Sequence, residues 1–119
     1  MARILVVDDA AFMRVRAAKV LADNGHEVAM AENGREAVNI YAQWRPDAVL
    51  MDITMPEMDG LAALKEIRKL DPSACVAMVT AMGQQAIVME ALRAGAKDFV
   101  LKPFQPDRIL ATLQKLLAA

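Results

Sequence analysis

Cysteine and histidine are almost absent from this chain of 119 residues, which contains one of each, Cys75 and His26. A single cysteine forms neither an internal disulfide nor a multi-cysteine metal site. Aromatic residues make up only 4 %, and 14 basic against 15 acidic residues give a net charge of −1. Nucleic-acid-binding proteins are typically basic, with aromatic side chains between the basic ones. The composition therefore disfavours that class.

Long apolar runs are missing as well. The longest unbroken one, residues 74–79, has six residues, whereas a membrane-spanning helix needs about 20. Near the N-terminus the apolar stretch is interrupted by Asp8 and Asp9, which is unlike a secretory signal. We therefore expect a cytoplasmic protein.

Short apolar runs recur along the chain, and hydrophobic residues make up 56 % of it. Continuous runs of this length are typical of strands buried on both faces of a parallel sheet. The stretches between them have helical spacing. The runs cover residues 4–7, 28–31, 48–51, 75–79 and 99–101. The helical faces comprise Ala11, Val15, Ala18 and Ala22; Ala37, Val38, Tyr41 and Trp44; Leu61, Leu64 and Ile67; and Ile109, Leu113 and Leu116.

Glycine, proline and one asparagine mark where these helices begin and end. Gly25 and Gly95 follow two of the helices, where a left-handed residue commonly ends a helix. Asn33 and Glu36 have the spacing of a capping box. The chain is therefore predicted to be one α/β domain, residues 1–119, with five βα units. Five units are too few for a closed eight-stranded barrel, so we expect an open, doubly wound parallel sheet.

Polar side chains follow four of the predicted strands at the point where each strand ends. In open α/β sheets, the functional site lies at the carboxyl ends of the strands. Three carboxylates brought together there would repel one another, and Mg²⁺ would relieve that repulsion. A lysine opposite them would bind an incoming anion. These features predict a phosphoryl-transfer site containing Asp8, Asp9, Asp52, Thr80 and Lys102.

Each of these residues also has an ordinary explanation when it is taken alone. An Asp-Asp pair often starts a helix, a threonine often lies in a turn, and a lysine is usually solvated. The convergence of all of them on one edge favours function. A dinucleotide site is excluded because none of the five glycines forms a G-x-G motif, and a P-loop is absent too.

Four segments of the chain together resemble the response regulator receiver domain family. They are Val6-Val7-Asp8-Asp9, Met51-Asp52, Val79-Thr80-Ala81 and Val100-Leu101-Lys102-Pro103-Phe104. Residues 9–14, 52–58 and 81–85 resemble more closely the stand-alone chemotaxis regulators of thermophilic and Gram-positive bacteria. The resemblance implies a flavodoxin-like sheet with strand order 2-1-3-4-5.

The same resemblance implies a role for each carboxylate. Asp52 would accept the phosphoryl group from a sensor histidine kinase. Asp9, Asp52 and the backbone carbonyl of Thr54 would bind Mg²⁺, or alternatively Mn²⁺, and Asp8 would assist through a water molecule.

Further positions are assigned by the resemblance around the phosphoryl group. Lys102, Thr80 and the N–H of Ala81 would bind phosphoryl oxygens, and the Lys102–Pro103 peptide bond would be cis. Phe99 occupies the family's switch position without the hydroxyl of the frequent tyrosine. Thr54 and Met82 would flank the path of hydrolytic water.

The remaining expectations concern partners. Because the chain ends about where the receiver fold ends, we expect a monomer that acts through protein contacts and not through nucleic acid or membrane insertion. Its chemistry would be limited to its own phosphorylation and dephosphorylation. The expected partners are a CheA-like kinase, a flagellar motor switch protein and a chemotaxis phosphatase. Val88 is the expected exposed contact in the fourth helix. The alternatives are a stand-alone phosphorelay carrier and an adaptor that is never phosphorylated.

Overall fold

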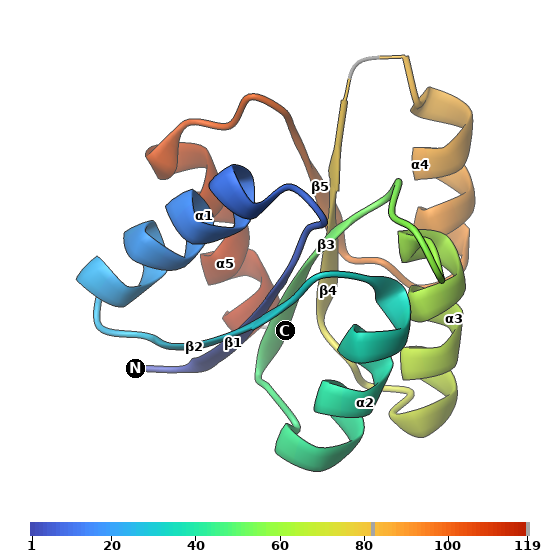
Figure 1. Cartoon of the computed structure of the whole chain (residues 1–119), viewed down its shortest axis with the longest axis horizontal. Helices are drawn as coiled ribbons and strands as arrows, with labels where there is room; N and C mark the ends of the chain where they lie inside the picture. Colours follow the sequence, from blue (N-terminus) through green and yellow to red (C-terminus); the bar gives the residue numbers. More distant parts are fainter. Residues whose placement is uncertain (82, 119) are drawn as a thin grey trace.

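The computed structural model describes residues 1–81 and 83–118, so Met82, expected beside the water path, lies outside the described residues. Within these ranges strands and helices alternate (Figure 1). The strands are β1 (Arg3–Val7), β2 (Glu27–Ala31), β3 (Ala48–Asp52), β4 (Val76–Thr80) and β5 (Asp98–Leu101). The helices are α1 (Ala11–Asp23), α2 (Gly34–Trp44), α3 (Gly60–Leu70), α4 (Gln85–Arg93) and α5 (Pro106–Ala118). No described helix is long and apolar enough to cross a membrane.

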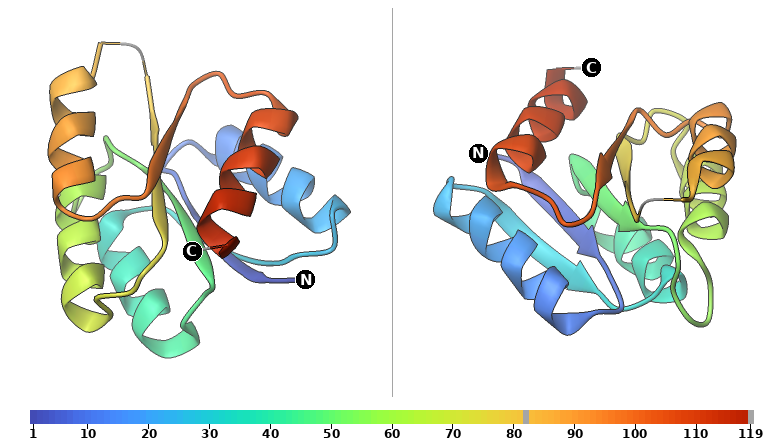
Figure 2. Two further views of the ribbon diagram at one scale, coloured as in Figure 1. Left: turned by 180° about the vertical axis from the view of Figure 1, so that it is seen from behind. Right: turned by 90° about the horizontal axis from the view of Figure 1, so that it is seen from above.

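The strands form one parallel sheet in the order β2-β1-β3-β4-β5, as predicted. Helices α1 and α5 cover one face, and α2, α3 and α4 cover the other (Figure 2). Each face has its own buried cluster, because the strands project apolar side chains alternately to both sides. The central strands are therefore apolar on both faces, which is why they appear in the sequence as unbroken runs.

The predicted helix boundaries are also confirmed. Asn33 Oδ1 accepts a hydrogen bond of 2.8 Å from the Glu36 N–H at the start of α2. Gly25 and Gly95 follow α1 and α4 with φ angles of +86° and +113°, which only glycine adopts readily. The Glu36 side chain accepts from the N–H of Glu32 at 3.3 Å, so the capping box is completed one residue earlier than its usual form.

The predicted buried face of α1 is wrong. Ala11, Val15 and Ala22 are exposed, whereas Ala17 and Leu21 face the sheet. Helix α1 is rich in alanine, whose small side chain gains little from burial on either side. Leu21 is the fully buried large side chain of α1, and it packs in the same cluster as Ile4 and Val6 of β1.

The prediction that Val88 is exposed is also wrong, because only 7 % of its surface is accessible. Consecutive residues of a helix are about 100° apart, so one of three apolar neighbours can face the sheet while the outer two diverge. Val88 faces the sheet together with Ala91, one turn later, and Ile87 and Met89 are exposed instead.

Candidate functional site

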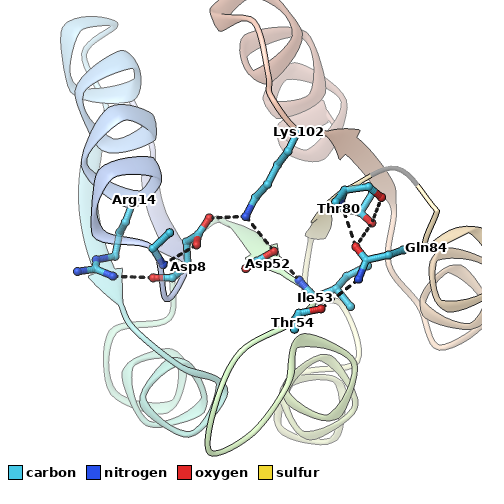
Figure 3. Close-up of polar contacts among 10 residues, drawn as sticks. Asp8, Arg14, Asp52, Ile53, Thr54, Thr80, Gln84 and Lys102 are labelled. Carbon is cyan, nitrogen blue, oxygen red and sulfur yellow. Dashed lines mark hydrogen bonds and ion pairs between the residues drawn. The ribbon is translucent and has the colours of Figure 1, made fainter.

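Four strand ends bring the predicted polar side chains to one edge of the sheet (Figure 3). Asp8 follows β1, Asp52 ends β3, Thr80 ends β4 and Lys102 follows β5. Because β1 and β3 are neighbours at the centre of the sheet, Asp8 and Asp52 lie side by side. This is where the strand order reverses, the usual position of a ligand site in such sheets.

Lys102 joins the two buried carboxylates. Its Nζ lies 3.0 Å from Oδ2 of Asp8 and 3.2 Å from Oδ1 of Asp52. The two aspartates are only 5 % and 6 % exposed. Their charges are therefore poorly solvated, and one ammonium group faces two carboxylates.

Asp9 adds a third carboxylate to this pair. Asp8, Asp9 and Asp52 each place an oxygen within 4.8 Å of the others, with Asp9 exposed and the other two buried. Hard divalent cations such as Mg²⁺ prefer oxygen ligands, and one or two carboxylates suffice when waters and a phosphate complete the shell. The donor set therefore fits Mg²⁺, and Asp9 is its solvent-exposed member.

The charge balance of the cluster is visible in two pKa shifts. Burial, and after it the charge of Asp8, raise the pKa of Asp52 to about 6, although Lys102 and the Ile53 N–H act to lower it. Burial lowers the pKa of Lys102, but hydrogen bonds and charges from Asp8 and Asp52 outweigh burial and hold it above its usual value. The cluster thus retains an excess of negative charge, which a proton or a metal ion would relieve.

Two backbone contacts hold Asp8 and Asp52 in place. Arg14, in the first turn of α1, donates from Nη1 to the backbone oxygen of Asp8 at 2.6 Å. The N–H of Ile53 donates to Oδ1 of Asp52 at 3.0 Å. The sequence did not indicate this contact of Arg14 with the backbone of Asp8.

Gly60 lies directly against the backbone of Asp52. Its N–H donates to the carbonyl of Ile53 at 2.7 Å, and a Cβ at this position would overlap the carbonyl oxygen of Asp52. The loop after β3 is therefore folded back onto the strand end, which fixes the start of α3 beside the site.

Thr80 does not contact the carboxylates and is instead held by Gln84. The hydroxyl of Thr80, a residue only 1 % exposed, donates to Oε1 of Gln84 at 2.7 Å. The same oxygen accepts from the N–H of Ala81 at 3.0 Å, and Nε2 of Gln84 donates to Oγ1 of Thr54 at 3.0 Å (Figure 3). Sequence analysis missed Gln84, since a glutamine before a helix has no specific signature.

Phe99 borders an apolar hollow of about 360 Å³ between α4 and β5, which reaches from Thr80 to the surface. The ring is half-buried, and the backbone oxygen of Phe99 accepts from Nη2 of Arg108 at 2.9 Å. Val88, Met89 and Leu101 line the same hollow. Phe99 thus lies beside α4, the helix that follows Thr80.

The predicted cis peptide bond between Lys102 and Pro103 is confirmed.

Comparison with known proteins agrees with this geometry. The response regulator receiver domain model matches residues 4–114. The chemotaxis protein CheY of Bacillus subtilis is 58 % identical over 116 residues, which are 97 % of this chain and 97 % of the relative. CheY of Thermotoga maritima is 56 % identical over 115 residues, 96 % of each chain.

A solved structure is similar over nearly the whole chain. It is the CheX–CheY–BeF₃–Mg²⁺ complex of Borrelia burgdorferi, in which the matching chain has a TM-score of 0.91 and 33 % identity. The match covers 96 % of this chain and 87 % of the other. The resemblance found in the sequence and the fold predicted from it are both confirmed.

Proposed function

The chain belongs to the response regulator receiver domain family, and on this premise we propose that it is a chemotaxis regulator phosphorylated on Asp52. The approach of Lys102 to the buried pair Asp8 and Asp52 carries the proposal. The identity to CheY proteins over 96–97 % of the chain supports the chemotaxis role. In this proposal the protein is a cytoplasmic switch, and its chemistry is limited to gaining and losing its own phosphoryl group.

The proposed reaction is a direct phosphoryl transfer to a carboxylate. An oxygen of Asp52 attacks the phosphorus of a phosphohistidine on a sensor histidine kinase. The P–N bond breaks as the O–P bond forms, and the leaving imidazole nitrogen takes up a proton from solvent. Because Lys102 and the Ile53 N–H both contact Oδ1, we assign the attack to Oδ2. The product is an acyl phosphate on Asp52.

The residues around Asp52 would bind the metal ion. Asp9, Asp52 and the carbonyl of Thr54 would hold Mg²⁺, or Mn²⁺ in its place, with Asp8 acting through a water molecule. When bound, the ion offsets the negative charge shared by the carboxylates and the phosphoryl group.

Lys102 and Thr80 respond to the new phosphoryl group. The ammonium of Lys102 turns from the carboxylates to a phosphoryl oxygen, which is a stronger acceptor. The Thr80 hydroxyl and the Ala81 N–H donate to other oxygens of the group. The space that Thr80 leaves is next to the hollow beside Phe99, so the aromatic ring can turn inward and change the surface of α4.

We place the output surface on α4 and β5, where several large apolar side chains are exposed. Met89 and Ile87 on α4 and Leu101 on β5 are 51 %, 38 % and 48 % exposed. The buried Val88 supports this face from behind and is not a contact itself. The proposed target is a flagellar motor switch protein.

A CheA-like kinase and a chemotaxis phosphatase are the other proposed partners. The Borrelia burgdorferi CheY has been solved with CheX, beryllofluoride and Mg²⁺, which supports protein contacts made by the activated form. We propose that the protein makes these contacts as a monomer and that it binds neither nucleic acid nor membrane.

The phosphoacceptor is tested with an isosteric variant. Purified CheA-like kinase labelled with radioactive phosphate should transfer the label to the wild-type protein in Mg²⁺ and not in EDTA. Asp52→Asn should take up no label, while Asp47→Asn, at the opposite end of the sheet, should be labelled normally. Undiminished label on Asp52→Asn would overturn the assignment.

The same labelled protein separates the proposed output from its alternatives. A regulator should bind immobilised motor switch protein more tightly once phosphorylated. A phosphorelay carrier should instead pass the label to a histidine phosphotransfer domain, and a non-phosphorylated adaptor should take up no label at all.

A further inference from the structure

One carboxamide occupies both donors that the proposed function assigns to the phosphoryl group. Oε1 of Gln84 accepts from the Thr80 hydroxyl at 2.7 Å and from the Ala81 N–H at 3.0 Å (Figure 3). A phosphoryl oxygen would need the same two hydrogens. We propose that Gln84 is a positioning residue that competes with the phosphoryl group for Thr80 and Ala81 and thereby sets the balance between the free and phosphorylated states.

The orientation of the Gln84 amide follows from its neighbours. With Oε1 facing Ala81, the amide accepts from a backbone N–H, which has no lone pair to offer. The reverse orientation would place two donors against each other. In the observed orientation Nε2 donates to Oγ1 of Thr54 at 3.0 Å, so all three contacts of the amide are satisfied together.

These contacts stabilise the unphosphorylated arrangement. Thr80 is almost fully buried, and its hydroxyl lies 2.7 Å from Oε1 of Gln84 and 3.1 Å from the carbonyl oxygen of Ala81. Gln84 therefore provides the shorter of its two contacts. Turning the hydroxyl toward Asp52 would break its hydrogen bond to Gln84, so this bond favours the present orientation. Phosphorylation must therefore displace the amide before Thr80 and Ala81 can bind the new group.

Displacement of Gln84 also reaches the output surface. Gln84 immediately precedes α4 and accepts the first backbone bond of the helix, from the Val88 N–H at 3.0 Å. Helix α4 carries Ile87 and Met89. If the backbone of Gln84 follows its displaced side chain, the start of the helix whose exposed side chains we assign to target binding moves with it.

Two substitutions at this position should act in opposite directions. Gln84→Ala removes the competing acceptor, so the probe beryllofluoride with Mg²⁺ should bind about fivefold more tightly, the factor that one net hydrogen bond provides. Gln84→Glu keeps the shape but supplies a charged acceptor, which holds both donors more strongly and repels the anion. Its beryllofluoride affinity should fall by at least about fivefold.

The neighbouring residue provides matched controls. Gln85 is exposed, so Gln85→Ala and Gln85→Glu should both bind beryllofluoride within about twofold of wild type, since surface substitutions change energies by only a few tenths of a kcal/mol. A second measurement needs no metal. In EDTA, hydrogen exchange of the Ala81 N–H should be faster in Gln84→Ala than in wild type, because its acceptor is gone.

The inference rests on the proposed function, and the same titration separates the two. If the wild-type protein binds no beryllofluoride in Mg²⁺, both are overturned. If the wild type binds it but Gln84→Ala binds equally or less tightly, the role of Gln84 is overturned and the proposed function stands. If Gln84→Ala does not fold, the isosteric Gln84→Glu carries the test, and unchanged affinity in that variant overturns the role.

Discussion

The Nζ atom of Lys102 lies 3.2 Å from Oδ1 of Asp52, so the proposed nucleophile is already ion-paired before any phosphodonor arrives. The pair keeps Asp52 more acidic than burial alone would allow. It also places the ammonium on Oδ1, next to the Oδ2 atom that we expect to carry the phosphoryl group. Lys102 therefore serves both the free and the phosphorylated state.

Lys102→Ala should retain some phosphorylation but weaken the activated state, because lysine binds the phosphoryl oxygens and is not the nucleophile. Loss of the ammonium also leaves the buried Asp8 and Asp52 unpaired, which should lower the free energy of unfolding near pH 8 by up to about 3 kcal/mol. Label from acetyl phosphate and binding to motor switch protein report the first effect, and urea unfolding reports the second.

Lys97→Ala is the control, since Lys97 is exposed and pairs with Val76 at the start of β4, the opposite end of the sheet from the carboxylates. Full target binding by phosphorylated Lys102→Ala would count against a signalling role for Lys102.

The raised pKa of Asp52 predicts a pH dependence of stability in the absence of metal. Its pKa is about 6 in the folded chain against an ordinary 3.8, so the folded state holds a proton that the unfolded state releases. This contribution is complete below about pH 4 and is lost as the pH rises through about 6. Asp52→Asn does not titrate and should be more stable than wild type by about 2 kcal/mol near pH 8.

Urea unfolding in EDTA from about pH 4.5 to about pH 8 checks this, because the groups that do not interact with Asp52 cancel in the difference between the two proteins. The advantage of Asp52→Asn should shrink steadily toward acid pH. A difference that stays constant over the range would mean that Asp52 titrates normally.

Mg²⁺ should raise the melting temperature of the wild-type protein, because it binds only where folding brings the three carboxylates together. At a concentration tenfold above the dissociation constant, the stabilisation is about 1.4 kcal/mol. Asp9→Ala should melt slightly higher than wild type without Mg²⁺, since one repelling charge is gone, and should respond weakly to the ion.

Asp23→Ala, an exposed carboxylate at the end of α1, should keep the full response to Mg²⁺. Melting curves that are indifferent to both Mg²⁺ and Asp9→Ala would mean that the carboxylates do not act together.

The exposed residues of α4 should be the target contact. Met89→Asp should reduce binding of the phosphorylated protein to motor switch protein at least about tenfold, as expected when an apolar contact near the centre of an interface is lost. Phosphorylation itself should be unchanged. Leu117→Asp, an exposed apolar residue near the end of α5, should bind normally.

Val88→Asp should behave differently from Met89→Asp, because Val88 is buried. It should lower the free energy of unfolding by more than about 2 kcal/mol, measured in urea, whereas Met89→Asp should leave it nearly unchanged. Normal target binding by phosphorylated Met89→Asp would move the output surface elsewhere, most directly to the α1 face that carries Arg14 and Arg16.

The strands and the meeting of Asp8, Asp52 and Lys102 could be predicted because they follow from two general constraints. A strand buried on both faces must be apolar throughout, so an unbroken apolar run such as residues 48–51 can be recognised as a strand from the sequence. Parallel strands bring their carboxyl ends to one edge. Together these rules place side chains from distant parts of the chain at one site, without reference to their surroundings.

The wrong or missing predictions concern features that depend on neighbouring elements in the folded protein, namely which helix face is buried and which side chains form hydrogen bonds. The alanines of α1 gain too little free energy from burial to indicate which face packs against the sheet. Val88 is apolar like its neighbours Ile87 and Met89 and differs from them only in the side of the helix on which it lies. Arg14 acts through a hydrogen bond to the backbone of Asp8, and Gln84 through one to Thr54 in another loop. Such contacts depend on side-chain geometry in the folded state and leave no spacing pattern in the sequence.

The close approach of Gly60 to the carbonyl of Asp52 affects how the protein would tolerate variation. In a library covering every substitution, Gly60 should score among the residues most sensitive for phosphorylation, although it offers no side chain to the reaction. Any Cβ there would push on the backbone of the nucleophile. Gly83 has open space around the position of its Cβ, so substitutions there should be limited by its φ of +91° and not by contact with the nucleophile. A screen that ranks positions by lost signalling would therefore report a chemical residue and a purely steric one as equals, and only stability measurements on each would tell them apart.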